Sequence, residues 1–195
     1  CSPAFASGVL RALPPGIVAK PQTDARKYLF FELRNGLRVM VSQDPDASAL
    51  AAAALVVQAG TVHEPKDIPG LAHFCEHMVL HGTTSLYHYS ESTFADYLKQ
   101  HGGSHNAATT TQQTCFAFEV VSDYLEGALH RFSRFFSSTY FDRGCGKKEV
   151  AAIESEHSMN LQNDFRRQWA ILLLDTNPEH PYHWGSGCRK SLETD

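Results

Sequence analysis

The alternation of hydrophobic and polar positions predicts strands in the first part of the chain. Two hydrophobic runs, 28–33 and 37–41, flank Asn35-Gly36, the dipeptide most typical of a tight β-hairpin turn. A nearly apolar run at 49–59 is followed by a glycine and a polar loop, which favours a strand over a helix. The chain therefore begins with strand-forming segments.

The next hydrophobic repeat changes to helical spacing. Four hydrophobic residues recur on one helical face between Leu71 and Met78, directly after Pro69-Gly70, where the proline is compatible with a first helical turn. Asp67 lies where an N-cap residue is expected. We therefore expect a helix over about residues 70–81.

The rest of the chain contains both strand-like and helix-like hydrophobic repeats. A short helix is expected to end at His101, and two strands joined by a turn near Gln112 account for 104–121. Ser122 is placed to cap a further helix, and one long helix is expected over 147–174. The predicted buried face of the helix after Ser122 consists of Leu125, Leu129, Phe132 and Phe136. This order predicts an α+β domain, with an antiparallel-rich mixed sheet and helices packed on one face.

Composition suggests a domain boundary and excludes some partners. Residues 1–26 are rich in Ala, Pro, Ser and Gly without periodicity, so we expect a weakly structured leader and one domain at 27–195. The 17 basic and 21 acidic residues form no basic block, which argues against nucleic acid as a partner. No apolar run approaches the roughly 20 residues that span a membrane.

The five cysteines bear on the compartment. They are odd in number and widely spaced, without a C-x-x-C pair, which predicts reduced thiols and favours the cytoplasm. The chain starts at Cys1 and not at a methionine, so a secretory or organellar signal could precede it. We expect this chain to be part of a longer protein.

The candidate chemistry lies on the helix predicted at 70–81. His73 and His77 are four residues apart, so they share a face and can reach one metal ion. Glu76 lies beside them, where a carboxylate can act on a metal-activated water without being a ligand. This is the H-x-x-E-H spacing of the inverted zinc-peptidase motif. A catalytic zinc normally has three protein ligands, so one must come from elsewhere.

The last long helix offers two glutamates for that position. Glu149 and Glu156 are two turns apart and share a face, whereas Glu154 points roughly 160° away from Glu156. Such a pair suits a metal ligand and a carboxylate that fixes the tautomer of a ligand histidine. Paired glutamates are also common on solvated helix faces, so the residues alone leave both interpretations open.

Taken together, these motifs resemble the pitrilysin family of zinc peptidases, and most closely its insulin-degrading-enzyme and nardilysin branch. The resemblance covers about residues 28–195. It rests on the segment 69–78 with Gly82-Thr83, on 103–107, on the E-V-A-A-I-E-S-E-H run at 149–157, on Asn160 with Asn163-Asp164, and on 177–181. It implies a pitrilysin-type metallohydrolase domain that is incomplete at its C-terminal end. The implied function is a zinc-dependent endopeptidase for unfolded peptides, with one Zn²⁺ per chain.

The resemblance also implies a role for each motif residue. It assigns zinc ligation to His73, His77 and Glu156. It assigns catalysis to Glu76, the general base toward a zinc-activated water, supported by Glu149. It assigns peptide binding to an edge strand that contains Asn106, Ala107, Ala108 and Thr109. Without the resemblance, this polar stretch would be interpreted as a surface hairpin.

Partners follow from the same resemblance. Enzymes of this family enclose peptide substrates between two halves, so the expected partner is the C-terminal half of the same longer protein. The isolated fragment should then be poorly active. An open sheet edge would also allow two copies to pair as a homo-oligomer. Two alternatives stay open: a non-catalytic peptide-binding homologue of the same fold, and a mitochondrial-type processing or presequence peptidase.

Two residues beside the motif need separate interpretation. His81 continues the row of histidines, where the insulin-degrading branch carries an apolar residue. We expect it to interact with the helix C-terminus, because a fourth protein ligand would close the metal site. Cys75 is expected to be a small, buried hydrophobic residue.

Overall fold

The computed structural model describes residues 8–12, 19–46, 49–81, 93–137, 141, 143–175, 177 and 186–193. Gly82, Thr83 and residues 178–181, on which part of the resemblance rests, lie outside these ranges. Contacts within the chain divide it into two compact units, 1–49 and 50–195.

The first unit contains a three-stranded antiparallel sheet in the order β1–β2–β3. Strands β2 (Lys27–Leu33) and β3 (Arg38–Gln43) form the expected hairpin, with Gly36 at a φ of 84° in its turn. Strand β1 (Val9–Ala12) pairs with β2, within the segment expected to be a leader. This unit comprises residues 1–49, so the hairpin groups with the start of the chain.

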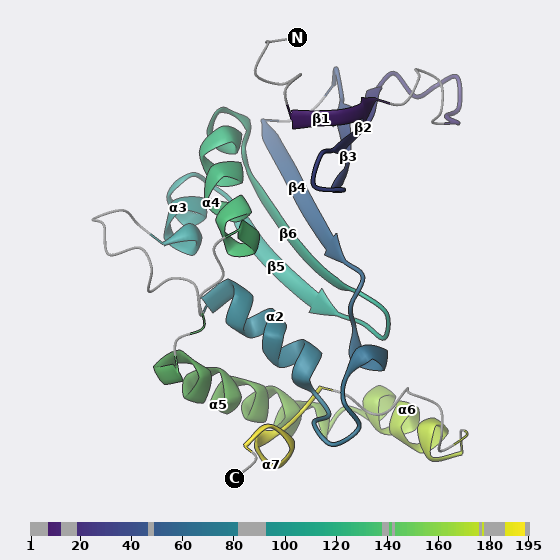
Figure 1. Cartoon of the computed structure of the whole chain (residues 1–195), viewed down its shortest axis with the longest axis vertical. Helices are drawn as coiled ribbons and strands as arrows, with labels where there is room; N and C mark the ends of the chain where they lie inside the picture. The colour runs from purple at the N-terminus through teal and green to yellow at the C-terminus, as the bar shows by residue number, and fades with distance from the viewer. Residues whose placement is uncertain are drawn as a thin grey trace. The chain divides into compact units, whose positions relative to one another are not determined.

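The second unit is built on another three-stranded antiparallel sheet, in the order β4–β6–β5 (Figure 1). Its strands are β4 (Leu50–Val57), β5 (Ser104–Thr109) and β6 (Thr114–Val121). In the central strand, Phe118 lies opposite Ala53 on one side and His105 on the other. Strand β5 is therefore an edge strand of the described sheet.

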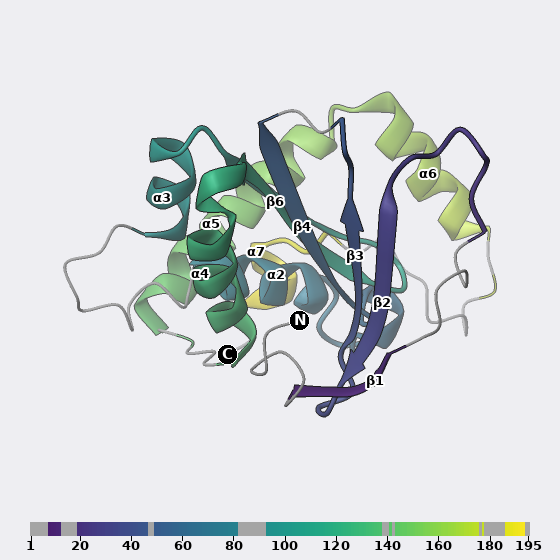
Figure 2. The ribbon, with the colours of Figure 1, turned by 90° about the horizontal axis from the view of Figure 1, so that it is seen from above.

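Helices cover one face of this sheet. Helices α3 (Phe94–Gln100) and α4 (Leu125–Ser137) lie on the same side of β4 and β6 (Figure 2). Helix α2 (Leu71–His81) lies between β5 and α5 (Arg143–Asn160) and contacts both (Figure 1). The α+β class with helices on one face is confirmed, and every strand pairing in the described ranges is antiparallel.

The core of this unit lies between β6 and the helices α3 and α4. Its buried residues are Phe94, Leu98, Phe116, Phe118, Val120, Ala128, Phe132 and Phe135. On α4 the prediction was partly wrong: Phe132 is buried, but Leu129 is 41% exposed and Ala128 is fully buried. A small side chain at Ala128 allows the helix to approach the sheet closely, which hydrophobic spacing alone does not reveal.

Helix α2 begins where the sequence predicts, but a different residue caps it. The carboxylate of Glu64 accepts hydrogen bonds from the amides of Gly70 (2.8 Å) and Ala72 (2.7 Å). It thereby satisfies amides that have no partner within the helix, and its charge is favourable at this end of the helix dipole. Glu64, and not Asp67, makes these hydrogen bonds.

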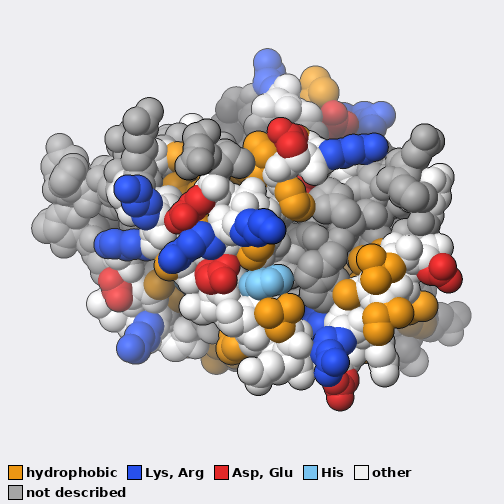
Figure 3. All heavy atoms as spheres, turned by 90° about the horizontal axis from the view of Figure 1, so that it is seen from below, with side chains coloured by type: hydrophobic (Ala, Val, Ile, Leu, Met, Phe, Trp, Pro, Cys, Tyr) orange, Lys and Arg blue, Asp and Glu red, His pale blue; other side chains and the backbone are white. Residues whose placement is uncertain are grey.

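The helix expected over 147–174 is in fact two helices. Helix α5 ends at Asn160, and α6 (Asp164–Leu174) begins after Asn163, whose side chain accepts a hydrogen bond from the Arg166 amide at 3.2 Å. This cap starts a new helix while the hydrophobic pattern continues across the break. Hydrophobic side chains gather on the surface of α6 (Figure 3), where Phe165 and Leu174 are 72% and 86% exposed. Within the described ranges, no helix is long and apolar enough to span a membrane.

A close backbone approach fixes the start of α2 against the segment before α7 (Arg189–Leu192). Gly70 has a φ of 96° and Gly187 a φ of 75°, both in the left-handed region that favours glycine. A Cβ atom on Gly70 would overlap the Cα atom of Gly187. Only glycine permits this approach, which also brings Ser186 next to α2.

We expect Gly70→Ala to lower the free energy of unfolding by about 2 kcal/mol, because both the left-handed backbone and the overlap with Gly187 must be relieved. Gly146→Ala is the matched control. Its Cβ would meet only Phe74 at 3.7 Å, so it should raise stability by about 0.5–1 kcal/mol. Urea unfolding followed by circular dichroism measures the free energy of unfolding of both variants. An unchanged free energy of unfolding in Gly70→Ala would contradict the close contact with Gly187.

Candidate metal centre

His73 and His77 lie one turn apart on α2 and face Glu156 on α5. Their Nε2 atoms are 3.2 Å apart. The two carboxylate oxygens of Glu156 lie 3.4 Å from His73 Nε2 and 3.6 Å from His77 Nε2. One ligand atom from each of these residues lies within 4.8 Å of the others. The structure thus brings the three expected ligands together from two helices.

Each imidazole is also held through its other ring nitrogen. His73 Nδ1 lies 2.7 Å from the carbonyl oxygen of Ser186, and His77 Nδ1 lies 3.0 Å from Glu149 Oε2. A carbonyl oxygen can only accept, so His73 Nδ1 carries a proton and donates it. We assign the same tautomer to His77 opposite the Glu149 carboxylate. Both unprotonated Nε2 atoms then point toward Glu156.

This arrangement fits a bound cation. Two Nε2 lone pairs and a carboxylate converge on one small volume. With the assigned tautomers, neither Nε2 atom carries a proton that it could donate to the other imidazole. Two histidines and one glutamate are the donor set of a catalytic zinc site that keeps a position open. His73, His77 and Glu156 are therefore the residues that could hold the metal. Glu149 and the Ser186 carbonyl would orient the two imidazoles.

Glu76 lies beside these residues without belonging to the cluster of potential ligands. It is only 7% exposed, and it lines a cleft of about 470 Å³ together with His73 and Glu156. Its carboxylate accepts a hydrogen bond from the hydroxyl of Thr109. The structure thus places Glu76 at the cleft beside the potential ligands and hydrogen-bonded to β5.

The cleft has one wall from β5 and another from α6. Of the four residues expected to bind a peptide, Ala107, Ala108 and Thr109 line it, whereas Asn106 lies in the same strand but is not part of the lining. Arg166 and Trp169 of α6 also line the cleft. The sequence did not point to these two residues, because their position depends on the break between α5 and α6.

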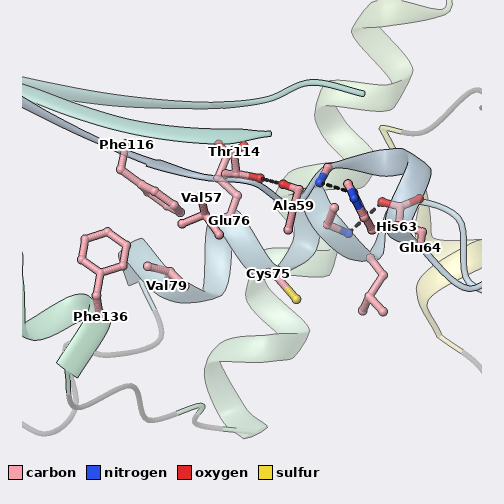
Figure 4. Close-up of a pocket in the computed structure, with 13 residues that line it drawn as sticks. Val57, Ala59, His63, Glu64, Cys75, Glu76, Val79, Thr114, Phe116 and Phe136 are labelled. Carbon is pink, nitrogen blue, oxygen red and sulfur yellow. Dashed lines mark hydrogen bonds between the residues drawn. The ribbon is translucent and has the colours of Figure 1, made fainter. Parts of the chain in front are cut away.

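A second, apolar pocket of about 270 Å³ lies on the other side of α2 (Figure 4). Its lining includes Val57, Cys75, Val79, Phe116 and Phe136. Cys75 was expected to be buried, which is wrong: its side chain is exposed at this pocket instead of packing in the core. Partial desolvation there, together with the nearby Glu64 carboxylate, raises the pKa of its thiol. Glu76 borders both cavities.

His81 is exposed at the end of α2 and is not part of the ligand cluster. Its ring centroid lies 6.2 Å from that of His77. The expected interaction of His81 with the helix terminus stays a prediction.

Comparison with known proteins agrees with this geometry. The model of the family described as "Insulinase (Peptidase family M16)" matches residues 38–176. The chain belongs to this family. It is 47% identical over 167 residues to the A-factor-processing enzyme of Saccharomyces cerevisiae, covering 84% of this chain and 16% of that protein. It is 39% identical over 178 residues to the insulin-degrading enzyme of Homo sapiens, covering 91% of this chain and 17% of that protein.

The fold is also that of a solved family member. The crystal structure of pitrilysin matches with a TM-score of 0.85 and 33% identity, over 95% of this chain and 19% of that chain. The family expected from the sequence and its pitrilysin-type fold are thus confirmed. The chain spans less than one fifth of the length of these relatives.

We expect the purified chain to hold about one zinc ion, and His77→Ala and Glu156→Gln to lose it, because each variant removes one of three ligands. Glu149→Gln should weaken zinc affinity about 10- to 100-fold by loosening His77. Elemental analysis and competition with a chelator measure both effects.

Glu154→Gln serves as the control. On another side of α5, the Glu154 carboxylate accepts a hydrogen bond from the Arg189 amide at 2.7 Å. This variant should bind zinc as the parent does. Undiminished zinc in His77→Ala would contradict the assigned site.

Proposed function

We propose that this chain is the metal-binding part of a zinc-dependent endopeptidase that cleaves unfolded peptides. The observation that carries this proposal is the convergence of the two histidine Nε2 atoms with Glu156, next to the buried carboxylate of Glu76. Membership of the insulinase family supports peptide hydrolysis. Relatives named for processing A-factor and for degrading insulin support peptides as substrates.

The edge strand would hold the substrate. An extended peptide can pair with the backbone of an edge strand, and β5 offers such an edge along the wall of the cleft. Pairing there would bring the peptide beside Glu76. Unfolded peptides can adopt this extended form, whereas the backbone of a folded protein is already paired.

Glu76 would transfer the proton during hydrolysis. Zinc, when held by His73, His77 and Glu156, supplies Lewis-acid polarisation of the peptide carbonyl and makes a water more acidic. Glu76 takes a proton from the attacking water while the oxygen of that water bonds to the carbonyl carbon. It then gives this proton to the amide nitrogen as the C–N bond breaks, which leaves a carboxyl and an amine product.

A complete enzyme needs more than these residues. The matched relatives extend far beyond this segment, since it covers 16% and 17% of their lengths. We therefore propose that the remaining part of a longer protein encloses the cleft and contacts the substrate carbonyl. On its own, this chain would bind zinc but cleave peptides slowly.

We expect Glu76→Gln to keep the parent's zinc content while lowering the rate of cleavage about 100- to 10,000-fold, because glutamine cannot accept the proton. Cleavage of an internally quenched fluorescent peptide measures the rate, and Glu154→Gln again serves as the control. Peptide binding that is unaffected by a chelator, together with equal rates in Glu76→Gln and the parent, would instead favour a non-catalytic peptide-binding homologue.

A further inference from the structure

The side chain of Glu76 is fixed by one hydroxyl. Among the described residues, its hydrogen-bond donor is Thr109, with 2.5 Å between Thr109 Oγ1 and Glu76 Oε2. In this hydrogen bond the hydroxyl donates and the carboxylate oxygen accepts. Glu76 is 7% exposed, so water has little access to replace the hydroxyl.

A second threonine lies beside this hydrogen bond. Thr114 lies opposite Thr109 in the pairing of β5 with β6, and their hydroxyl oxygens are 3.3 Å apart. The hydroxyl of Thr114 donates to the carbonyl oxygen of Ala59 at 2.8 Å (Figure 4). A hydroxyl has one proton, so Thr114 has none to donate to Thr109. The Thr109 proton therefore has two acceptors within reach, of which the Glu76 carboxylate oxygen is nearer than the Thr114 oxygen.

On its other side, no further hydrogen bond to the Glu76 side chain is found within the described ranges. There the carboxylate borders the apolar pocket, with Val79 and Phe116 in its lining (Figure 4). A glutamate has three rotatable side-chain bonds, and loss of its hydrogen bond would let the carboxylate move away from the cleft. Misplacement of a catalytic group by about 1 Å can cost 100-fold in rate.

We propose that Thr109 is a positioning residue for the general base. Its hydroxyl holds the Glu76 carboxylate at the cleft, while its backbone belongs to the strand that would pair with the substrate. Thr109 then has two roles: its side chain positions the base, and its backbone is part of the strand that would bind the peptide. This inference rests on the proposed role of Glu76, and Thr109 acts only through that residue.

The test removes the hydroxyl and keeps the shape. Thr109→Val retains a β-branched side chain suited to a strand, and Thr114 keeps its acceptor at Ala59. We expect kcat for a quenched fluorescent peptide to fall about 10- to 100-fold, with KM within about threefold of the parent and unchanged zinc content. Thr109→Ser restores the hydroxyl and should return kcat to within about threefold of the parent.

Ser104→Ala is the matched control. Ser104 also lies in β5, and its hydroxyl donates to the carboxylate of Glu119 at 3.1 Å, away from the cleft lining. Losing this hydrogen bond should leave kcat and KM unchanged. Three results would overturn the proposal: a kcat of Thr109→Val within twofold of the parent, loss of zinc in Thr109→Val, or no recovery in Thr109→Ser.

A second measurement needs no turnover. In a double-mutant cycle on the zinc-free chain, Thr109→Val should raise the unfolding equilibrium constant about tenfold, as expected for a lost hydrogen bond to a charged group. In the Glu76→Leu background the same change should have less than about a twofold effect. Equal effects in both backgrounds would show that Thr109 does not act through Glu76. If the chain cleaves peptides too slowly for kcat to be measured, this cycle alone tests whether Thr109 acts through Glu76.

The two proposals can fail separately. If Glu76→Gln cleaves as the parent does, the proposed function fails whatever Thr109 does. If Glu76→Gln loses activity while Thr109→Val keeps it, only the positioning role of Thr109 is wrong.

Discussion

The close approach of two imidazole Nε2 atoms is the constraint on which the candidate metal centre depends. With the tautomers assigned above, both protons lie at Nδ1, so the two Nε2 atoms present lone pairs toward each other at 3.2 Å. The rings keep this position through anchors on other segments: Glu149 on α5, and the Ser186 carbonyl, 113 residues from His73. The glycine contact between Gly70 and Gly187 brings that carbonyl close. The metal centre is thus organised by contacts between distant parts of the chain.

Helix α2 separates two different environments. One side carries the histidines and faces the cleft, whereas the other side borders an apolar pocket with Cys75 and Val79. Glu76 lies between them and is directed to the cleft by a hydrogen bond from β5. A carboxylate shielded in this way has few positions available, which suits a group that must transfer a proton at one place.

The sequence by itself determined the features that depend on local spacing. The Asn-Gly hairpin, helix α2 and strands β5 and β6 follow from hydrophobic periods and turn residues, because these hydrogen-bond patterns repeat within a few residues. The four-residue spacing of His73 and His77 and the seven-residue spacing of the two glutamates place each pair on one helical face. Together with the resemblance, this was enough to find the family and the metal cluster.

Only the tertiary structure decided which groups meet between elements. The Ser186 carbonyl is a backbone group that no residue type reveals, and Glu64 caps α2 from outside the helix. The Asn163 cap breaks one predicted helix and brings Arg166 and Trp169 to the cleft. The hydrogen bond from the Thr109 hydroxyl to Glu76 depends on the packing of α2 against β5. These contacts join residues far apart in the chain, so their geometry is set by the packed core and not by local sequence spacing.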